Sequence, residues 1–347
     1  MTDTPDRADD DTPDPGAEAG VDNAGDPLRS PPESRSVPEL LRFGVINVDK
    51  PAGPSSHQLS AWVRDAINET LAALDSDGEP IDGVAHAGTL DPKVTGCLPT
   101  LTGDATRAAQ VFLEGRKEYV SVLELHGSAP TDFREVAAEF EGEIYQKPPR
   151  KSAVTRRLRT RRIHDLDVLE IADRQALLRI RCESGTYVRK LCHDIGLATG
   201  VGAHMGHLRR TATDPFDDRD LHILQDLFDA LAWAEEGDEA FLREVVRPAE
   251  DALVHLPSVT IAPSAARNVA TGAPVYAPGV IGVEGVDTTN GADIGGADAE
   301  NDRDRRGDDA PLVACHTPNG TAVCLGRLVG DPAADSGVVV SLERVLL

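Results

Sequence analysis

The sequence predicts an α+β protein that ends in a separate, β-rich unit. Segments typical of strands and helices alternate irregularly, without the regular strand–helix period of a parallel α/β fold and without an internal repeat. A boundary near residues 250–257 is followed by short strand-like segments separated by turn residues. With 347 residues and 40% apolar side chains, the chain is long enough for two domains with cores of their own.

The first elements follow an N-terminal segment that we expect to be disordered. Residues 1–38 carry ten acidic side chains, three arginines and many prolines, with too little apolar surface to offset the entropy of ordering. Residues 43–50 then predict a strand. The next segment predicts a helix capped by Ser55 or Ser56. Its apolar stripe consists of Leu59, Trp62, Val63, Ile67, Leu71 and Leu74.

The middle of the chain predicts a strand at residues 119–127, and then a strand, a tight Ser-Gly turn and a helix over residues 176–200. The buried face of that helix is expected to contain Val188, Leu191, Cys192 and Ile195.

The acidic stretch at about 285–310 has eight acidic side chains and three arginines, and we expect a surface loop insertion there. A last strand closes the chain. The expected parts are a tail (1–38), a larger domain (39–253) and a β-rich domain (254–347).

Composition says less about partners than the net charge suggests. The net charge of −24 argues against nucleic acid on bulk electrostatics. However, the chain has 6 lysines against 29 arginines, with abundant aspartate, a composition typical of halophilic proteins from salt-accumulating haloarchaea. At about 1 M salt the Debye length is about 3 Å, so long-range charge carries little information about binding there.

We expect a soluble, cytoplasmic protein without a membrane segment. The sequence has no signal peptide and no apolar run near the ~20 residues that span a bilayer. The cysteines are odd in number and form no CxxC pair, so neither a metal site nor a disulfide framework is expected. Buried free thiols are expected at Cys97, Cys182, Cys192, Cys315 and Cys324.

One short stretch reverses the charge of its surroundings. Between Arg150 and Arg162 the sequence RKSAVTRRLRTRR carries seven positive charges and no acid. A run of charges is usually a solvated face, but arginine binds phosphate in bidentate geometry, which keeps part of its strength at high salt. The run therefore predicts binding of RNA or another polyanion, through Arg150, Lys151, Arg156, Arg157, Arg159, Arg161 and Arg162.

A second candidate site is the aspartate in HAGTLDPKVTG, residues 86–96. Asp-Pro commonly begins a helix, with Asp91 as the N-cap and Pro92 at the first helical position. Alternatively, Pro92 holds Asp91 in an extended conformation, and Gly88 and Gly96 permit unusual backbone angles, so that the carboxylate is fixed on a loop. The stretch alone leaves both interpretations open.

Three further side chains have a structural and a functional interpretation. Tyr187 and Arg189 follow a Gly-containing turn at a helix start, where side chains can converge on a cleft. A half-buried core tyrosine and a surface salt bridge are the simpler interpretations. Tyr119, in KEYV, is ordinarily a packing residue. With an RNA partner its ring could instead stack on an extruded base, because every base has a π-face.

Taken together, these stretches resemble the TruB and dyskerin family of pseudouridine synthases. Six motifs occur in the family's order over residues 38–347, and HAGTLDPKVTGCLP is similar to its catalytic motif. TLDPKVTGCLP and RTRRIHDLDVLE are closer to the archaeal and eukaryotic dyskerin branch. The other motifs are VDKPAGPSSH, KEYV, YQKPPRKSAV, RCESGTYVRKLCHDIG and GHLRRT. The resemblance implies a catalytic domain with a mixed, mainly antiparallel sheet flanked by helices, and a C-terminal, all-β PUA pseudobarrel.

The resemblance also implies a role for each matching residue. Asp91 would be the catalytic aspartate, and Arg189 would pair with its carboxylate and orient it. Tyr119 would stack on the target uracil. Further roles fall to Tyr187 (lining the pocket), Leu208 (packing against the base), His86 (holding the RNA with its target nucleotide flipped out) and Lys50 (supporting the catalytic loop).

The implied reaction isomerises uridine in rRNA or tRNA to pseudouridine and needs no cofactor. The dyskerin branch implies the catalytic subunit of a box H/ACA particle, with a guide RNA held at its ACA end by the PUA domain, and three small protein partners. The alternative is a stand-alone synthase of TruB type acting on the tRNA T-loop. An RNA-binding scaffold without catalysis and a polyanion-binding module of unrelated fold are the competing classes. The joint presence of Asp91, Tyr119, Tyr187 and Arg189 disfavours the scaffold.

Overall fold

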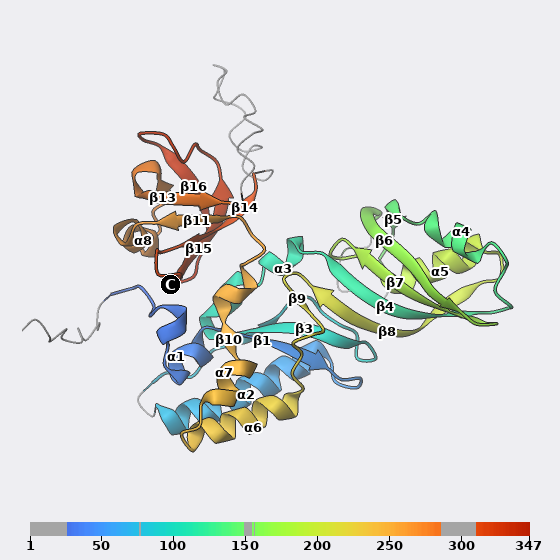
Figure 1. Cartoon of the computed structure of the whole chain (residues 1–347), viewed down its shortest axis with the longest axis horizontal. Helices are drawn as coiled ribbons and strands as arrows, with labels where there is room; N and C mark the ends of the chain where they lie inside the picture. The colour runs from blue at the N-terminus through green and yellow to red at the C-terminus, as the bar shows by residue number, and fades with distance from the viewer. Residues whose placement is uncertain (1–25, 76–77, 149–154, 156, 286–309) are drawn as a thin grey trace, which may run out of the picture.

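A computed structural model describes residues 26–75, 78–148, 155, 157–285 and 310–347 (Figure 1). Residues 1–25 of the expected tail, nearly all of the expected insertion, and Arg150, Lys151 and Arg156 lie outside the described residues. The helices are α1 (Val37–Arg42), α2 (Ser56–Leu74), α3 (Val111–Glu114), α4 (Phe133–Ala138), α5 (Val188–Ala198), α6 (Leu224–Glu235), α7 (Ala240–Val245) and α8 (Pro263–Ala270). The short 3₁₀ helices are η1 (Pro32–Ser34), η2 (Gly103–Ala108), η3 (Ala249–Ala252) and η4 (Ala277–Gly279).

The larger sheet extends across most of the molecule and is mixed but mainly antiparallel. Its strands are β1 (Gly44–Lys50), β2 (Val84–His86), β3 (Thr95–Thr102), β4 (Lys117–Leu125), β5 (Gly142–Gln146), β6 (Arg159–Ile171), β7 (Gln175–Cys182), β8 (Ala203–Thr213), β9 (Phe216–Asp217) and β10 (Arg247–Pro248). The order is β10-β1-β3-β8-β4-β7-β6-β5, with β2 beside β3 and β9 beside β8. β3 and β8 run parallel, whereas the other named strand pairs of this sheet run antiparallel. The predicted mixed α+β class is confirmed.

Three hydrophobic cores lie along this sheet, and one of them joins β1, β3 and β9 to β14 (Leu312–His316) and β15 (Ala322–Leu328) of a second, smaller sheet. Of the other two, one packs α2, α6 and α7 against β1 and β3, and the other packs α4 and α5 against β4, β6 and β7 (Figure 1). Tyr119 and Leu208 are half-buried and pack against both of these two cores. These two residues therefore mark the junction of the two halves of the sheet.

The helices agree with the sequence pattern except at one aromatic residue. Ser55 caps α2, accepting from the Gln58 N–H (3.2 Å) while its own N–H donates to Gln58 Oε1 (3.0 Å). Trp62 was expected in the buried stripe, and this prediction is wrong because its side chain is 46% exposed. α6 covers only one side of α2, so Trp62 lies at the edge of the contact between the helices. The predicted buried face of α5 is confirmed.

The expected tail is too long at its C-terminal end, because residues 26–38 pack on the rest of the protein. Arg35 is 2% exposed and donates to both carboxylate oxygens of Glu250, at 2.8 and 2.7 Å. Glu250 in turn accepts from the Ala322 N–H at 3.1 Å. Asp26 pairs with Arg267 at 2.6 Å. Long-range ion pairs order this segment, and local composition does not reveal them.

The smaller sheet contains β11 (Ser258–Ile261), β12 (Val275–Tyr276), β13 (Val280–Glu284), β14 (Leu312–His316), β15 (Ala322–Leu328) and β16 (Val338–Val345). Its order is β12-β16-β15-β14-β11-β13, and α8 packs on it. The chain passes from the larger to the smaller sheet between Ala252 and Ser258. All five cysteines are buried. Within the described residues no helix is both long enough and apolar enough to span a membrane.

Candidate active site

Asp91 lies in a tight loop between β2 and β3, which we call the Asp91 loop (residues 87–94). The Val94 N–H donates to the Asp91 carbonyl at 2.9 Å, and β3 begins at Thr95, so a turn follows Asp91 in place of a helix. The helix-start interpretation is therefore wrong. Gly88 and Gly96 adopt φ of +87° and +99°, in the left-handed region that favours glycine. The loop interpretation describes this backbone.

The buried Lys50 forms hydrogen bonds to the backbone of the Asp91 loop. Lys50 is 0% exposed, and its Nζ donates to the carbonyls of Pro51 (2.9 Å), Pro92 (3.3 Å) and Val94 (2.9 Å). Burial lowers the pKa of Lys50, and the nearby Asp91 carboxylate acts in the opposite direction. The bonds to Pro92 and Val94 fix the backbone that follows the aspartate, and the bond to Pro51 ties it to the segment after β1.

The two flanks of the loop bond to α2 and to β8. The Ser56 hydroxyl accepts from the Leu90 N–H (2.9 Å) and donates to the Leu90 carbonyl (3.1 Å). The buried Arg210 of β8 reaches both sides of the loop, donating from Nε to the Cys97 carbonyl (2.7 Å) and from its terminal nitrogens to the Gly88 carbonyl (3.3 Å). Arg210 escaped the sequence analysis. Its position in the motif GHLRRT, two residues after the predicted pocket residue Leu208, is the sequence feature that could have identified it.

Asp91 and Arg189 form an ion pair between the loop and the first turn of α5. Their side chains are 51% and 49% exposed, so both remain accessible from solvent. The guanidinium fixes the direction of the carboxylate through a charge-assisted hydrogen bond. The surface salt bridge and the orienting contact that the sequence left as alternatives are thus one interaction.

Two further predicted residues lie on the adjacent strands β4 and β8. Tyr119 is opposite Arg210, and Leu208 is opposite Ser121. Burial raises the pKa of the Tyr119 hydroxyl, and the Arg210 guanidinium beside it acts in the opposite direction through its charge and a hydrogen bond. Leu208 and Tyr119 share the junction of the two halves of the larger sheet, and Arg210 links Tyr119 to the Asp91 loop.

Tyr187 is the N-cap residue of α5 and is held through its backbone. Gln146, the last residue of β5, accepts from the Tyr187 N–H at 2.9 Å and donates to the Tyr187 carbonyl at 3.2 Å. Gln146 is 2% exposed. The sequence analysis quoted it within YQKPPRKSAV but assigned it no role.

His86, at the end of β2, packs edge-on against His57, with ring centroids 5.2 Å apart. Burial is the main cause that lowers the pKa of His86, and His57 and Arg210 contribute in the same direction. Its Nδ1 is buried and has no hydrogen-bond partner among the described residues. His86 thus lies immediately before the Asp91 loop. At any pH above its lowered pKa its imidazole ring is predominantly neutral.

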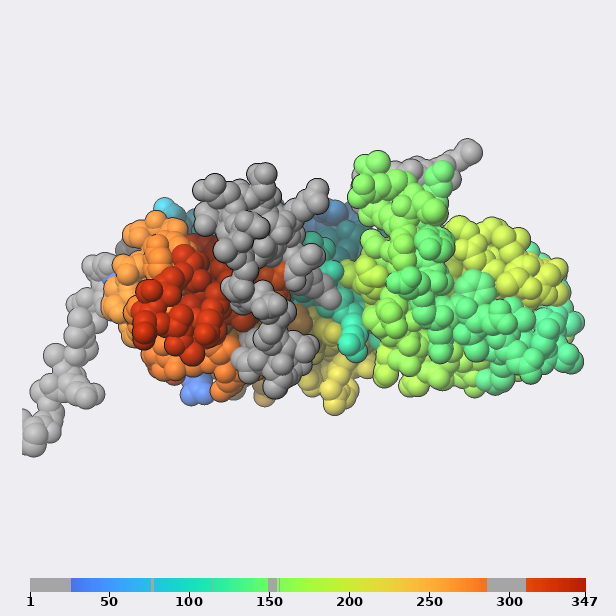
Figure 2. All heavy atoms as spheres, turned by 90° about the horizontal axis from the view of Figure 1, so that it is seen from above, coloured from blue at the N-terminus to red at the C-terminus, as the bar shows by residue number. Residues whose placement is uncertain are grey.

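The described part of the basic run lies on β6 and just before it, beside the turn that leads to α5. Arg157 and Arg162 are exposed, and Arg159 and Arg161 are half-buried. Arg161 forms an ion pair with Glu183 at 3.4 Å. In Figure 2 the N-terminal end of β6 projects from the molecule beside the end of β5. The structure therefore places Arg161 and Arg162 beside the turn that leads to α5.

Comparison with known proteins agrees with this geometry. A model described as TruB family pseudouridylate synthase (N terminal domain) matches residues 80–135 and 127–188. The tRNA pseudouridylate synthase B C-terminal domain matches residues 189–254, and the DKCLD (NUC011) domain matches residues 26–60. The DKCLD match includes residues 26–38, which the structure shows packed on the protein although their composition predicted disorder.

Curated relatives and solved structures match almost the whole chain. A probable tRNA pseudouridine synthase B of Haloarcula marismortui is 61% identical over 92% of this chain and 94% of its own. One from Methanopyrus kandleri is 44% identical over 91% and 86%. A crystal structure of a Cbf5–Nop10–Gar1 complex has a TM-score of 0.78 and 40% identity, covering 93% of this chain and 91% of that one. An H/ACA RNP bound to a substrate RNA containing 2′-deoxyuridine matches with a TM-score of 0.76, 39% identity and coverage of 92% and 90%. This chain therefore belongs to the TruB family of pseudouridine synthases.

Proposed function

We propose that this chain isomerises uridine to pseudouridine at the Asp91 loop, as the catalytic subunit of a guide-RNA particle of box H/ACA type. The observation that carries the proposal is the solvent-accessible ion pair between Asp91 and Arg189. Asp91 belongs to a loop whose backbone is fixed by hydrogen bonds from Lys50. A carboxylate held in one direction but open to solvent is suited to act on a substrate that arrives from outside.

The reaction conserves all atoms. The bond between N1 of uracil and C1′ of the ribose breaks, the base turns, and C5 bonds to C1′; C5 loses a proton and N1 gains one. The target base must leave its stack, which costs a few kcal/mol. In our proposal Asp91 acts on the ribosyl uracil as nucleophile or base, Tyr119 stacks on the uracil, and Leu208 packs against it. Tyr187 lines the same pocket.

RNA outside the target nucleotide would be held by three regions. His86 would hold the strand beside the flipped nucleotide. The basic run would contact phosphates, with Arg157 and Arg162 exposed for that purpose among the described residues. The smaller sheet would be the PUA pseudobarrel that binds the ACA end of a guide RNA. Its mixture of antiparallel pairs with the parallel pair β11–β14 supports that proposal.

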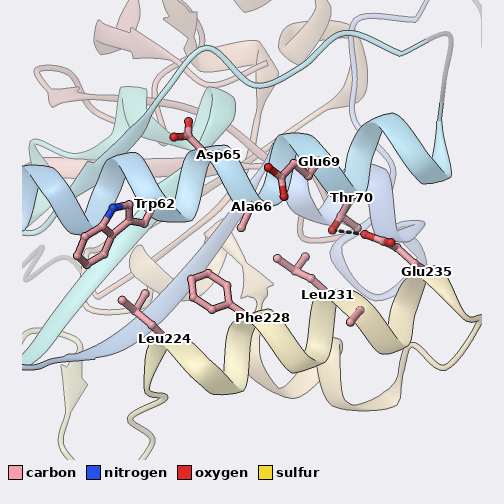
Figure 3. Close-up of a pocket in the computed structure, with 10 residues that line it drawn as sticks. Trp62, Asp65, Ala66, Glu69, Thr70, Leu224, Phe228, Leu231 and Glu235 are labelled. Carbon is pink, nitrogen blue, oxygen red and sulfur yellow. Dashed lines mark hydrogen bonds between the residues drawn. The ribbon is translucent and has the colours of Figure 1, made fainter.

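Small proteins would complete the particle. One complex that matches this chain contains Nop10 and Gar1 by name, and another contains Nop10. A groove of about 630 Å³ between α2 and α6 offers a surface for such a partner (Figure 3). Trp62 and Phe228 extend into it from opposite helices and are 46% and 37% exposed, so the groove presents apolar surface to solvent. Because Glu69 and Glu235 also line it, the groove favours an apolar, basic protein segment over RNA.

A stand-alone tRNA synthase is the second candidate function. Its support is that the curated relatives carry the name tRNA pseudouridine synthase B. The two functions can coexist in one chain, since both would use the same Asp91 site. They differ in whether a guide RNA and protein partners are needed.

Single-turnover pseudouridine formation in high potassium chloride tests both candidates. Wild type and Asp91→Asn are compared on a tRNA transcript alone and on a target RNA with guide and partner proteins. We expect product in the guided reaction and none with Asp91→Asn. Product on tRNA alone would favour the stand-alone function. Activity that survives the substitution would overturn the assignment of Asp91.

A further inference from the structure

We propose that Gln146 is a positioning residue that couples the β5–β6 hairpin to Tyr187 and Arg189; this inference rests on the proposed function. Gln146 bonds to neither Asp91 nor Arg189 through its side chain. It would act by setting where α5 begins, and so where the guanidinium meets the carboxylate. RNA held by the hairpin would thereby influence the geometry of the reaction.

The contact between Gln146 and Tyr187 is a two-point clamp on the backbone. The amide oxygen accepts from the Tyr187 N–H and the amide nitrogen donates to the Tyr187 carbonyl, at 2.9 and 3.2 Å. A paired residue on a neighbouring antiparallel strand makes the same two bonds, so the side chain replaces a strand that is absent at this position. Tyr187 itself is extended, with φ −93° and ψ 93°, and its own side chain gives α5 no cap.

The clamp lies two residues from the catalytic ion pair. Val188 follows Tyr187 and is 4% exposed, which fixes the start of α5 against its core. Arg189 is next, and its guanidinium contacts Asp91. Because these residues are consecutive, a shift of the Tyr187 backbone moves Arg189 with it.

A second set of contacts binds the same turn to the hairpin. The Glu183 carboxylate accepts from the Arg162 N–H at 3.0 Å and pairs with Arg161 at 3.4 Å. The turn before α5 is thus bonded to the end of β5 and to the start of β6. Those two strand ends flank the basic run, whose exposed arginines are proposed to contact RNA. Among these contacts, Gln146 is the buried and uncharged one, so salt screens it least.

The test is the single-turnover rate of Gln146→Met, measured with saturating RNA, guide and partners. Methionine keeps the volume and removes both hydrogen bonds. A misplacement of about 1 Å at a reacting group can cost about 100-fold, so we expect a 10- to 100-fold slower rate with unchanged RNA affinity. Gln175→Met is the matched control, because Gln175 is an exposed glutamine of the same sheet that bonds to Glu124, and we expect its rate to equal that of wild type.

Two further measurements separate positioning from general stabilisation. In an Arg189→Ala background, Gln146→Met should slow the reaction by less than about 3-fold, since its effect runs through Arg189. Gln146→Glu should recover, relative to wild type at the same pH, as pH falls, because a protonated carboxyl can donate to the Tyr187 carbonyl as the amide does. This profile decides the question if Gln146→Met does not fold.

A wild-type rate for folded Gln146→Met, fully additive losses with Arg189→Ala, or a flat relative pH profile for Gln146→Glu would each overturn the inference. A loss confined to RNA affinity would overturn it as well. None of these outcomes affects the proposed function, because that function fails only if wild type forms no pseudouridine or if Asp91→Asn remains active.

Discussion

The two sides of the Asp91–Arg189 pair are held in different ways. On the aspartate side, the buried cations Lys50 and Arg210 donate directly to backbone carbonyls of the loop and its flanks. On the arginine side, a neutral amide and the more exposed pair Arg161–Glu183 hold the turn before α5. Salt screens exposed charges far more than buried ones. In high salt the Arg161–Glu183 pair should therefore weaken most, which leaves the aspartate side the more rigid one and makes the arginine side depend mainly on Gln146.

The largest test of this difference is Lys50→Met. The substitution removes the donor to the buried Val94 carbonyl and to the part-buried Pro51 and Pro92 carbonyls, of which Pro92 keeps a bond from the Gly53 N–H, and a buried unsatisfied group costs about 1–3 kcal/mol. We expect the free energy of unfolding to fall by about 3 kcal/mol, and the single-turnover rate to fall by about 100-fold in the fraction that folds. Denaturant unfolding in high potassium chloride measures the first quantity. Lys93→Met, at an exposed lysine of the same loop, should change stability by less than about 0.5 kcal/mol.

Gly96→Ala should have the next largest effect, and Gly142→Ala provides a matched control. Both glycines have φ near +100°, at +99° and +96°. A Cβ at Gly96 would lie 2.2 Å from the Arg210 carbonyl oxygen, whereas one at Gly142 would meet nothing within 4 Å. Backbone strain alone costs about 1–2 kcal/mol, so Gly142→Ala should lose about that much.

Thermal and denaturant unfolding of both variants would measure the difference. We expect Gly96→Ala to lose at least about 1 kcal/mol more than Gly142→Ala, since the clash displaces the start of β3 or the C-terminal end of β8. Equal losses would show that the two backbones are equally free to move and that the aspartate side is not especially rigid.

Tyr119→Phe tests the link from Arg210 to Tyr119, for which we propose base stacking. The ring remains and the hydroxyl beside the guanidinium is removed. Because the guanidinium beside this hydroxyl also bonds to the Gly88 carbonyl of the loop, we expect loss of the hydroxyl to lower the single-turnover rate by about 10-fold or less. Tyr145→Phe, on a 69% exposed tyrosine of β5, should leave the rate unchanged. A full rate with Tyr119→Phe would mean that stacking alone positions the base.

The smallest expected effect is a pH dependence from His86. Burial lowers its folded-state pKa below the ordinary 6.5, so the unfolded chain binds a proton more readily near that pH. The stability contributed by neutral His86 is therefore fully present above pH 6.5 and declines as pH falls below it. The free energy of unfolding of wild type should fall more steeply from pH 7.5 to 5 than that of His86→Gln. His193→Gln, at an exposed histidine of α5, should follow wild type.

The elements and the Asp91–Arg189 pair could be predicted from the sequence because local signals and motifs carry them. Residues 176–200, for example, show the strand, the turn and the helix in their own pattern. Gln146 and Arg210 were missed because their role depends on partners 41 and 122 residues away. Trp62 was misplaced because helical spacing identifies an apolar stripe but not how much of it a neighbouring helix covers.

The Arg35–Glu250 ion pair also affects how cooperatively the protein unfolds. It joins a segment before the first long strand, the connection between the two sheets, and β15. If the smaller sheet alone detached, Glu250 would lose its hydrogen bond from the Ala322 N–H. The buried ion pair between Arg35 and Glu250 would also become exposed to solvent. Such partial unfolding has a high free energy, so intermediates in which only one sheet is unfolded should be scarcely populated. Calorimetry should accordingly record one heat-absorption peak for the whole protein, with the calorimetric and van't Hoff enthalpies close to each other.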